Sequence, residues 1–530
     1  MQSIVQRLMV LIGSAAVLGV LCHSVFAEGP ARRQLNVCVY DHAFGVTSEG
    51  TPDPLKTSQM QYFNLQHQVF ETLVKIDLNT NTVLPLLAEK WERIDPLIVR
   101  FYLRHGVRFH NDERFNAAAV KFTLDLMRNP RSRFAGRFLL DTIEEVTVVG
   151  EHTVDIKTRI YDGMLLRKLA AIGFIIPPGY YNRVGESYFS HHPIGTGPLR
   201  FFYADDAPSG YKKIHFVKNE NYWRSLDMNF QELVYHCIAP DKQWDALRSG
   251  TLDMLVGLPL PPGSIKGSKN TTVFSELSLR NAALLLNVDK QGPLASLPFR
   301  QALQHAVRRQ EIIKDGLDGY GMPLYGITPR GALGHCPQPP RYKEDLKKAR
   351  VLMVKAGYEN GVVLKMVVGA HEPSMTVAGI LKKQLARAGI TLEVTSFSRE
   401  ELLQKVIEPR LKGEQVPNDF DMALISGWPS LFGTGTHFYS VFLHSGGLFN
   451  IGTYRRKDSP IDKLYSAALA ADDMDRLCTD LKKLDTYLLD HALIVPLYQF
   501  EMVYGMRKNI RFNPGMNDMP LRFDQCRIIE

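Results

Sequence analysis

Two kinds of hydrophobic pattern divide the chain. From residue 34 to about residue 290, apolar and polar residues mostly alternate, which is the pattern of half-buried β-strands. The alternating segments are QLNVCVY (34–40), IVRFYLR (98–104), EEVTVVGEHTVDIKT (144–158), LRFFYA (199–204), KKIHFVK (212–218), ELVYHCIA (232–239) and NAALLLNV (281–288). This part of the chain is therefore expected to consist mainly of strands, with a few helices.

Between residue 294 and about residue 495, apolar residues recur every three to four positions, which predicts helices with one buried face. The segments with this period are FRQALQHAVRRQEIIKDGL (299–317), KEDLKKARVLMVKAGY (343–358), TVAGILKKQLARAGI (376–390) and DRLCTDLKKLDTYLLDHA (475–492). Two of them end in Ala-Gly before a strand-like run, so Gly357 and Gly389 are predicted to cap helices of α/β units. Strand character returns in IVPLYQF (494–500). The change near 290 predicts a domain boundary, and the return near 495 predicts that the chain re-enters its first lobe.

The segment from residue 98 to 120 predicts a strand, a bend, a turn and the start of a helix. Phe101 and Leu103 lie on one face of the strand, because side chains alternate along a strand. Gly106 permits the bend, and Asn116 is the expected N-cap of a helix that begins with three alanines. The segment is therefore interpreted as architecture and not as a catalytic motif.

The first 27 residues have the pattern of a secretory signal peptide. Arg7 precedes an apolar run at 8–22, and the small residue Ala27 stands where a cleavage site is expected. The run is shorter than the roughly 20 residues that cross a bilayer, although an uncleaved membrane anchor is the alternative. The mature chain is expected to begin near Glu28 and to work in the periplasm.

Composition and charge narrow the classes of function. The 530 residues are 45% hydrophobic and 22% charged, as in an ordinary globular protein of two or three domains. The formal net charge is +8, but Lys and Arg are scattered, so no nucleic-acid partner is expected. None of the six cysteines lies in a C-x-x-C pair, which argues against structural zinc and thioredoxin-like chemistry. Cys38 and Cys237 lie in apolar strand-like runs and are expected to be buried thiols.

Motifs for catalysis are not found in the sequence. It contains no G-x-S-x-G, no H-E-x-x-H, no zinc-spaced His/Cys cluster and no dinucleotide-binding glycines. The run Gly195-Thr196-Gly197 lacks the lysine and helix start of a phosphate loop, so it is interpreted as a tight turn before a strand. No enzyme activity and no cofactor are expected, and a secreted hydrolase is the less favoured alternative.

A collinear series of motifs resembles one family. PLLAEKWERIDPLIVRFYLRHGVRFHNDERFNAAAVKFTLDLM (85–127) resembles the signature region of family 5 extracellular solute-binding proteins, the peptide- and nickel-binding components of ABC importers. Four further segments resemble that family in the same order: HPIGTGPLRFF (192–202), NENYWRS (219–225), WDALRSGTLDM (244–254) and LLLNVDKQGPLASLPFRQALQHAVRRQEII (284–313). Each motif is weak alone, whereas the ordered set spans nearly the whole mature chain.

The resemblance implies a two-lobed α/β periplasmic binding protein fold with mixed β-sheets, hinged lobes and a ligand cleft between them. Lobe I would comprise residues 28–288, including a small subdomain at about 76–190, and the C-terminal return at 496–530. Lobe II would comprise residues 289–495. It also implies a monomer that traps a small-molecule ligand by hinge closure and delivers it to an inner-membrane ABC permease with a cytoplasmic ATPase.

The resemblance also nominates ligand-binding residues. On lobe I, the segment KTSQMQYF (56–63) matches a loop that meets ligand in relatives, and on lobe II the candidates follow a tryptophan. The candidate ligand-binding residues are Ser58, Gln59, Tyr62, Phe63, Trp428, His437 and Phe438. His437 lies nine residues after Trp428, as a nickel-binding histidine does in relatives, and is the candidate metal ligand. The alternatives are that His437 is a packed or surface histidine and that Trp428 belongs to the core.

The ligand itself stays open at this point. Peptide-binding relatives pair an Asp after the tryptophan with the free amine of the peptide, but no acidic residue occurs here between Asp421 and Asp458. A buried ammonium group without a carboxylate partner is costly, which disfavours a free-amine peptide. Peptide, nickel chelate, haem and other small polar molecules are the alternatives for the ligand. A secreted sensor or chaperone is the alternative to transport.

Overall fold

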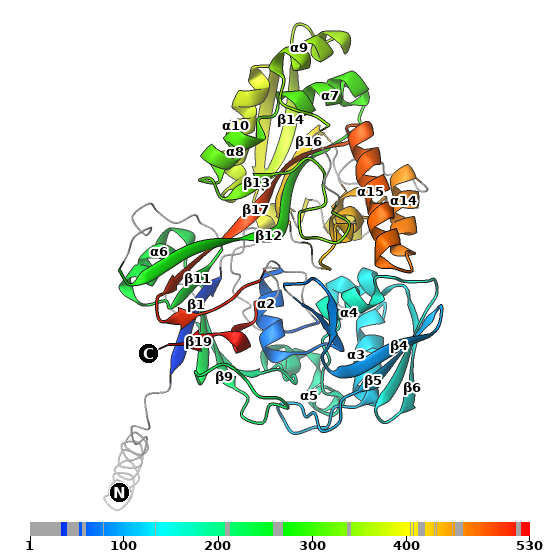
Figure 1. Ribbon diagram of the computed structural model, residues 1–530, viewed down its shortest axis with the longest axis vertical. Helices are drawn as coiled ribbons and strands as arrows, with labels where there is room; N and C mark the ends of the chain where they lie inside the picture. Colours follow the sequence, from blue (N-terminus) through cyan, green and yellow to red (C-terminus); the bar gives the residue numbers. More distant parts are fainter. Residues whose placement is uncertain are drawn as a thin grey trace, which may run out of the picture.

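The computed structural model has two lobes that share one large sheet (Figure 1). It describes residues 33–39, 52–55, 60–77, 79–132, 134–206, 212–257, 269–335, 341–402, 404–405, 408–411, 419–428, 430, 432–447, 449–450, 459–515 and 521–529. The expected signal peptide at 1–27 and the candidates Ser58 and Gln59 lie outside these residues. No helix in the described ranges is long and apolar enough to cross a membrane.

The large sheet has 11 strands of mixed direction, so the expected mixed α/β architecture is confirmed. From one edge to the other the strands are β15 (Ile390–Phe397), β14 (Val362–Gly369), β16 (Met422–Trp428), β12 (Thr271–Leu286), β17 (Ile494–Arg507), β11 (Met254–Val256), β1 (Gln34–Val39), β10 (Glu232–His236), β9 (Lys212–Lys218) and β8 (Leu199–Asp206). The short strand β13 (Gly321–Pro323) pairs with β17 outside this order. Strands β14 to β16 belong to lobe II, and β1 and β8 to β11 belong to lobe I.

Strands β12 and β17 run through both lobes (Figure 1). They are antiparallel partners over most of their length, but the pairing register is interrupted between Leu277 and Asn281. On one side of this interruption β17 pairs with β11, and on the other side β12 pairs with β16. The two lobes are therefore joined by paired strands with an irregular point between them.

The lobe II strands are covered by helices on both faces. Alternate residues of one strand enter different cores: Leu284 packs with the helices on one face, and Leu285 packs with those on the other. The lobe II helices are α7 (Leu297–Ala306), α8 (Arg309–Gly316), α9 (Leu346–Lys355), α10 (Ser374–Ala386), α11 (Arg399–Leu402), α12 (Glu408–Leu411), α13 (Thr436–Phe438), α14 (Pro460–Leu469) and α15 (Met474–Asp490), with the short helical turns η2 (Pro293–Ala295) and η4 (Tyr439–Leu443). The predicted caps are confirmed, since Gly357 follows α9 with φ +85° and Gly389 follows α10 with φ +86°.

Lobe I carries a second sheet in the order β4-β5-β7-β6, within the residues 76–190 that were expected to form a small subdomain (Figure 1). Its strands are β4 (Ala88–Asp95), β5 (Ile98–Leu103), β6 (Ile143–Gly150) and β7 (Thr153–Thr158); the hairpin β2 (Val74–Ile76) and β3 (Val83–Pro85) precedes it. The lobe I helices are α2 (Met60–Val69), α3 (Ala117–Arg128), α4 (Leu165–Ile172), α5 (Pro178–His191) and α6 (Pro240–Ser249), with η1 (Ala135–Leu140). The predicted β5 face is confirmed, because Phe101 and Leu103 are buried.

The described part of the C-terminal segment makes hydrogen bonds to residues of lobe I. It contains β18 (Ile510–Arg511), η5 (Phe523–Gln525) and β19 (Arg527–Ile528). The backbone N–H of Leu521 donates to the Asn64 side chain at 2.9 Å, and the backbone N–H of Ile528 donates to Asn229 at 2.9 Å. Cys38 and Cys237 are buried thiols, as predicted, and burial raises the pKa of Cys38 to about 12.

Candidate functional site

Trp428 ends β16 and lies in an aromatic cluster with His437, Phe442 and Phe449. Its ring centroid is 4.8 Å from that of Phe442 in an edge-to-face arrangement, and 5.6 Å from those of His437 and Phe449. Such contacts give a rigid apolar wall. The indole Nε1 of Trp428 is buried and has no hydrogen-bond partner among the described residues. The aromatic cluster therefore presents the Trp428 N–H as a donor with no acceptor in the part of the chain that the structure describes.

The helical turns after Trp428 place His437 and Phe438 next to this cluster. Helix α13 continues directly into η4, and both side chains are buried, at 3% and 2% exposure. The ring of Phe432 lies 5.3 Å from that of His437 and extends the contacts toward lobe I. The structure thus places three candidates from the sequence, Trp428, His437 and Phe438, next to one another.

A hydrogen bond between a buried tyrosine and a buried aspartate joins η4 to helix α15. The Tyr439 hydroxyl donates to Asp485 on α15 at 2.8 Å, and the same carboxylate oxygen accepts from the backbone N–H of Ile327 at 3.0 Å. Burial raises the pKa of Asp485 and that of Tyr439. The hydrogen bonds fix the backbone of η4 relative to α15, so the aromatic cluster rests on rigid elements.

Lobe I reaches the same segment through Asn81 and Arg167. The Arg167 guanidinium donates to the backbone oxygen of Phe432 at 2.8 Å, to the Asn81 side-chain oxygen at 3.0 Å and to the Asn81 backbone oxygen at 2.6 Å. The Asn81 amide donates to the oxygens of Gly433 at 2.6 Å and Gly331 at 3.2 Å. We call these bonds the inner contact between the lobes.

The charge of Arg167 is the main electrostatic feature of the inner contact. The residue is 6% exposed, and its described acceptors are all neutral amide oxygens. Burial lowers the pKa of Arg167 to about 10, so the guanidinium stays charged at neutral pH. A buried cation held only by neutral acceptors leaves a positive potential beside the aromatic cluster.

A second set of bonds joins the lobes farther along the chain. The backbone N–H of Gly163 donates to the oxygen of Leu469 at the end of α14 at 3.1 Å. The Tyr161 hydroxyl donates to the oxygen of Asp472 at 3.3 Å. We call these bonds the outer contact; together the two contacts show that the lobes are closed against each other.

The lobe I motifs converge on one buried carboxylate, that of Glu71. It accepts hydrogen bonds from the Tyr222 hydroxyl at 2.6 Å, the Trp223 indole at 2.9 Å and the Thr196 hydroxyl at 3.0 Å. A Cβ on Gly195 would lie 2.1 Å from the backbone oxygen of Val69, so that position requires glycine. The Gly-Thr-Gly run is therefore the tight turn that the sequence predicts, and the Tyr-Trp pair supports it.

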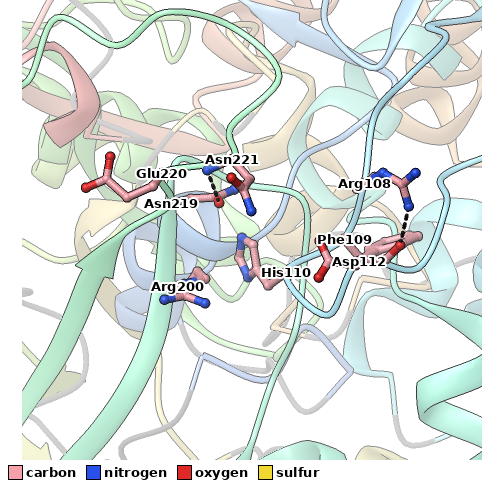
Figure 2. Close-up of a pocket in the computed structure, with 8 residues that line it drawn as sticks. All are labelled: Arg108, Phe109, His110, Asp112, Arg200, Asn219, Glu220 and Asn221. Atoms are coloured by element: carbon pink, nitrogen blue, oxygen red, sulfur yellow. Dashed lines mark hydrogen bonds between the residues drawn. The ribbon is translucent and has the colours of Figure 1, made fainter.

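A small polar pocket of about 120 Å³ lies in lobe I, apart from the two contacts between the lobes (Figure 2). Its lining residues are Arg108, Phe109, His110, Asp112, Arg200, Asn219, Glu220 and Asn221. His110 lies at its centre, and both ring nitrogens are engaged, with the backbone oxygen of Gly197 at 3.0 Å and the backbone N–H of Gly195 at 3.4 Å. Burial lowers the pKa of His110 to about 4, so the neutral ring supports the turn.

The remaining sequence candidates have different outcomes. Tyr62 and Phe63 lie in α2, but their side chains, like Ser58 and Gln59, are outside what the structure describes. Within the described ranges, no group of three or more His, Cys, Asp or Glu side chains could hold a metal ion. Asn81 and Arg167 were not predicted; the one sequence signal for Arg167 is a charged pair, Arg167-Lys168, inside the apolar helix MLLRKLAAI.

The protein has two α/β lobes that share strands. The lobes close with an aromatic cluster on one side and a basic residue on the other, which is the arrangement of a two-lobed ligand-binding protein. Residues 82–450 match the model of the bacterial extracellular solute-binding proteins, family 5 (middle region), and the chain belongs to this family. The resemblance inferred from the motifs is confirmed, and the protein is a solute-binding component of the ABC-importer type.

Relatives and solved structures agree with this assignment. The glutathione-binding protein GsiB of Pectobacterium atrosepticum is 27% identical over 357 residues, which are 66% of this chain and 66% of that protein. The dipeptide-binding protein of Escherichia coli (strain K12) is 25% identical over 508 residues, 88% of this chain and 90% of that protein. The structure of NikA from Brucella suis in complex with Fe(III)-EDTA superposes with a TM-score of 0.81 at 22% identity, covering 93% of this chain and 99% of that chain. The structural similarity supports the two-lobed fold.

Proposed function

We propose that this protein is exported by its N-terminal signal peptide and works as a monomer in the periplasm. There it captures a small carboxylate-bearing solute between its lobes and delivers it to an inner-membrane ABC permease with a cytoplasmic ATPase. The observation that carries the ligand proposal is the buried indole N–H of Trp428, which has no acceptor among the described residues. An unsatisfied buried donor costs about 1–3 kcal/mol, and a ligand oxygen would remove that cost.

The charges around the site favour an anionic ligand group. Segment 422–457 contains no acidic residue, and the Arg167 guanidinium has only neutral acceptors in its described hydrogen bonds. A ligand ammonium group would meet the positive potential of Arg167 and no acidic residue of segment 422–457, whereas a carboxylate would be attracted. Glutathione, dipeptides and EDTA chelates, the ligands in the names of the similar proteins, all bear carboxylates.

The proposed binding surface combines both lobes. Trp428 would stack on the ligand and donate its N–H, with His437 and Phe438 completing the lobe II side. Ser58, Gln59, Tyr62 and Phe63 would contact the ligand from lobe I. A metal would arrive as a preformed chelate with His437 as its only protein ligand, because carboxylates of the chelator can fill the remaining coordination positions.

Native mass spectrometry of the full exported chain tests the proposal, because it detects a co-purified solute of any chemical identity by its mass. A bound solute with at least one carboxylate is expected. Calorimetric titration with glutathione, the dipeptide Met-Leu, Ni(II)–histidine and Fe(III)-EDTA then ranks the candidates. A solute held through its ammonium group alone, or turnover of any of these compounds, would contradict the proposal.

The first prediction concerns Trp428→Phe, which keeps an aromatic ring and removes the N–H. The affinity for the solute identified above is expected to fall about 5- to 30-fold, since one hydrogen bond in a buried site is lost. Trp91→Phe, in the small sheet of lobe I, is the matched control and should leave the affinity unchanged. Equal affinities for Trp428→Phe and the parent protein in calorimetry would exclude the indole donor from the site.

A further inference from the structure

The outer contact is made by a glycine that nothing larger can replace in the closed form. A Cβ added to Gly163 would lie 2.2 Å from the backbone oxygen of Ala471 and 3.3 Å from that of Leu469, both in lobe II. The backbone of Gly163 lies outside the left-handed region, so alanine suits its local conformation. The requirement for glycine therefore comes from the opposite lobe and not from the fold of lobe I.

The lobe II side of the outer contact is the end of a helix. The last carbonyls of an α-helix have no partner within the helix and carry its partial negative charge. After α14 ends at Leu469, lobe I supplies donors to two carbonyls of this region, those of Leu469 and Asp472. Closure thus gives the carbonyls of Leu469 and Asp472 hydrogen-bond donors, whereas opening exposes these carbonyls to water.

The lobe I side is fixed before closure. The Asp162 carboxylate accepts from the backbone N–H of Met164 at 2.9 Å, from the Thr142 hydroxyl at 2.6 Å and from the Lys168 ammonium at 2.8 Å. Arg93 lies over the Tyr161 ring at 4.4 Å and donates to the Asp162 backbone oxygen at 3.2 Å. These bonds lie within lobe I, so little order has to be imposed on residues 161–163 when the lobes meet.

The lobe I side of the inner contact is also fixed by hydrogen bonds within lobe I. Asn81 has φ +55° and closes a turn in which its backbone N–H donates to the oxygen of Asp77 at 2.9 Å. The Asp77 carboxylate accepts from the backbone N–H of Thr80 at 2.8 Å. Gly433 receives this turn, and a Cβ there would lie 1.9 Å from the Asn81 side-chain oxygen.

We propose that the inner and outer contacts form an intrinsic closing interface. They populate the closed form in the absence of solute, and Gly163, Asn81 and Arg167 thereby determine solute affinity. The proposal rests on the proposed function only for the consequence for affinity. If only a fraction of the molecules is closed, the apparent affinity is reduced by that fraction, so groups that favour closure tighten binding whatever the ligand is.

Gly163→Ala is the second prediction and the test of this interface. The closed-to-open ratio of the solute-free full chain is expected to fall about tenfold or more, since the added methyl overlaps backbone that cannot move freely. Small-angle scattering of protein freed of solute by unfolding and refolding should show a larger radius of gyration than the parent. Amide hydrogen exchange of residues 161–163 should be faster.

Gly379→Ala is the matched control, because a Cβ at Gly379 on α10 meets no atom within 4 Å. It should leave the scattering curve unchanged, and far-ultraviolet circular dichroism should show that both variants fold. Tyr161→Phe, which removes one donor of the outer contact, should shift the ratio in the same direction by about two- to fivefold. Superimposable curves for the parent and Gly163→Ala would overturn the proposal. Because this test uses no ligand, its failure is distinct from a failure to find a bound solute.

Discussion

At the scale of single residues, Glu71 explains why two separate motifs of lobe I occur together. Thr196 comes from one segment and the adjacent pair Tyr222-Trp223 from another, and all three side chains donate to this one carboxylate of a residue that is 3% exposed. Burial raises the pKa of Glu71 above its ordinary value of 4.5 despite these donors. The folded protein therefore binds a proton at Glu71 more tightly than the unfolded chain does.

The third prediction concerns Glu71→Ala and Glu71→Gln. Alanine leaves three buried donors without an acceptor and should lower the free energy of unfolding by about 3 kcal/mol. The stabilisation from the raised pKa is complete below pH 4.5 and is lost as the pH rises through that pKa. The loss caused by Glu71→Gln, which cannot titrate, should therefore be larger near pH 4 than near pH 7 in urea unfolding. A loss independent of pH would mean that folding does not change the pKa of Glu71.

At this scale the sequence nominated part of the candidate site, and its role in ligand binding stays a prediction. Trp428 and His437 were nominated through the family resemblance, in which a histidine follows a tryptophan at about nine residues. Asn81 and Arg167 could not be found, since the oxygens they bind lie 352 and 265 residues away along the chain. Only the closed arrangement of the lobes brings these groups together, and no local pattern encodes it.

At the scale of elements, helix starts and ends could be predicted from the sequence because they depend on residues that are near one another in the chain. The Asn116 side chain accepts from the backbone N–H of Ala119 at 3.1 Å and caps α3, as the sequence predicts. Gly357 and Gly389 end helices for the same kind of reason. The succession of α13 and η4 was not predicted, because its form depends on Asp485, which belongs to α15.

The fourth prediction follows from the cap of α3. Asn116→Ala removes the acceptor for the Ala119 N–H and should lower the free energy of unfolding by about 1 kcal/mol. Asn116→Asp keeps an acceptor at the positive end of the helix and should be neutral or slightly stabilising at pH 7. Thermal unfolding followed by circular dichroism compares the two. Equal losses for both variants would mean that the side-chain bond is not the cause.

At the scale of the whole molecule, Gln499 lies at the irregular point between the lobes. Its side-chain amide donates to the backbone oxygens of Ser278 at 2.7 Å and Arg330 at 2.8 Å, and its oxygen accepts from the Arg330 N–H at 2.8 Å. It is 1% exposed, so water cannot replace these bonds. Gln499 thus connects β12, β17 and a lobe II loop where the strand pairing is interrupted.

The fifth prediction concerns Gln499→Ala. Three buried backbone groups lose their partner, so the free energy of unfolding should fall by about 3 kcal/mol, and the Arg330 amide should exchange faster with solvent. Amides of α10, which lies away from this point, serve as the internal control and should keep their protection. Unchanged exchange at Arg330 would mean that the connection between the strands does not depend on this side chain.

Strand β17 lies between β12 and β11 in the centre of the large sheet, although it comes from the end of the chain. The sheet formed by the earlier strands therefore has a gap between β12 and β11 until residues 494–507 fill it. A product that stops before these residues exposes two open strand edges to chaperones and proteases. The large sheet is therefore continuous only in chains that contain residues 494–507.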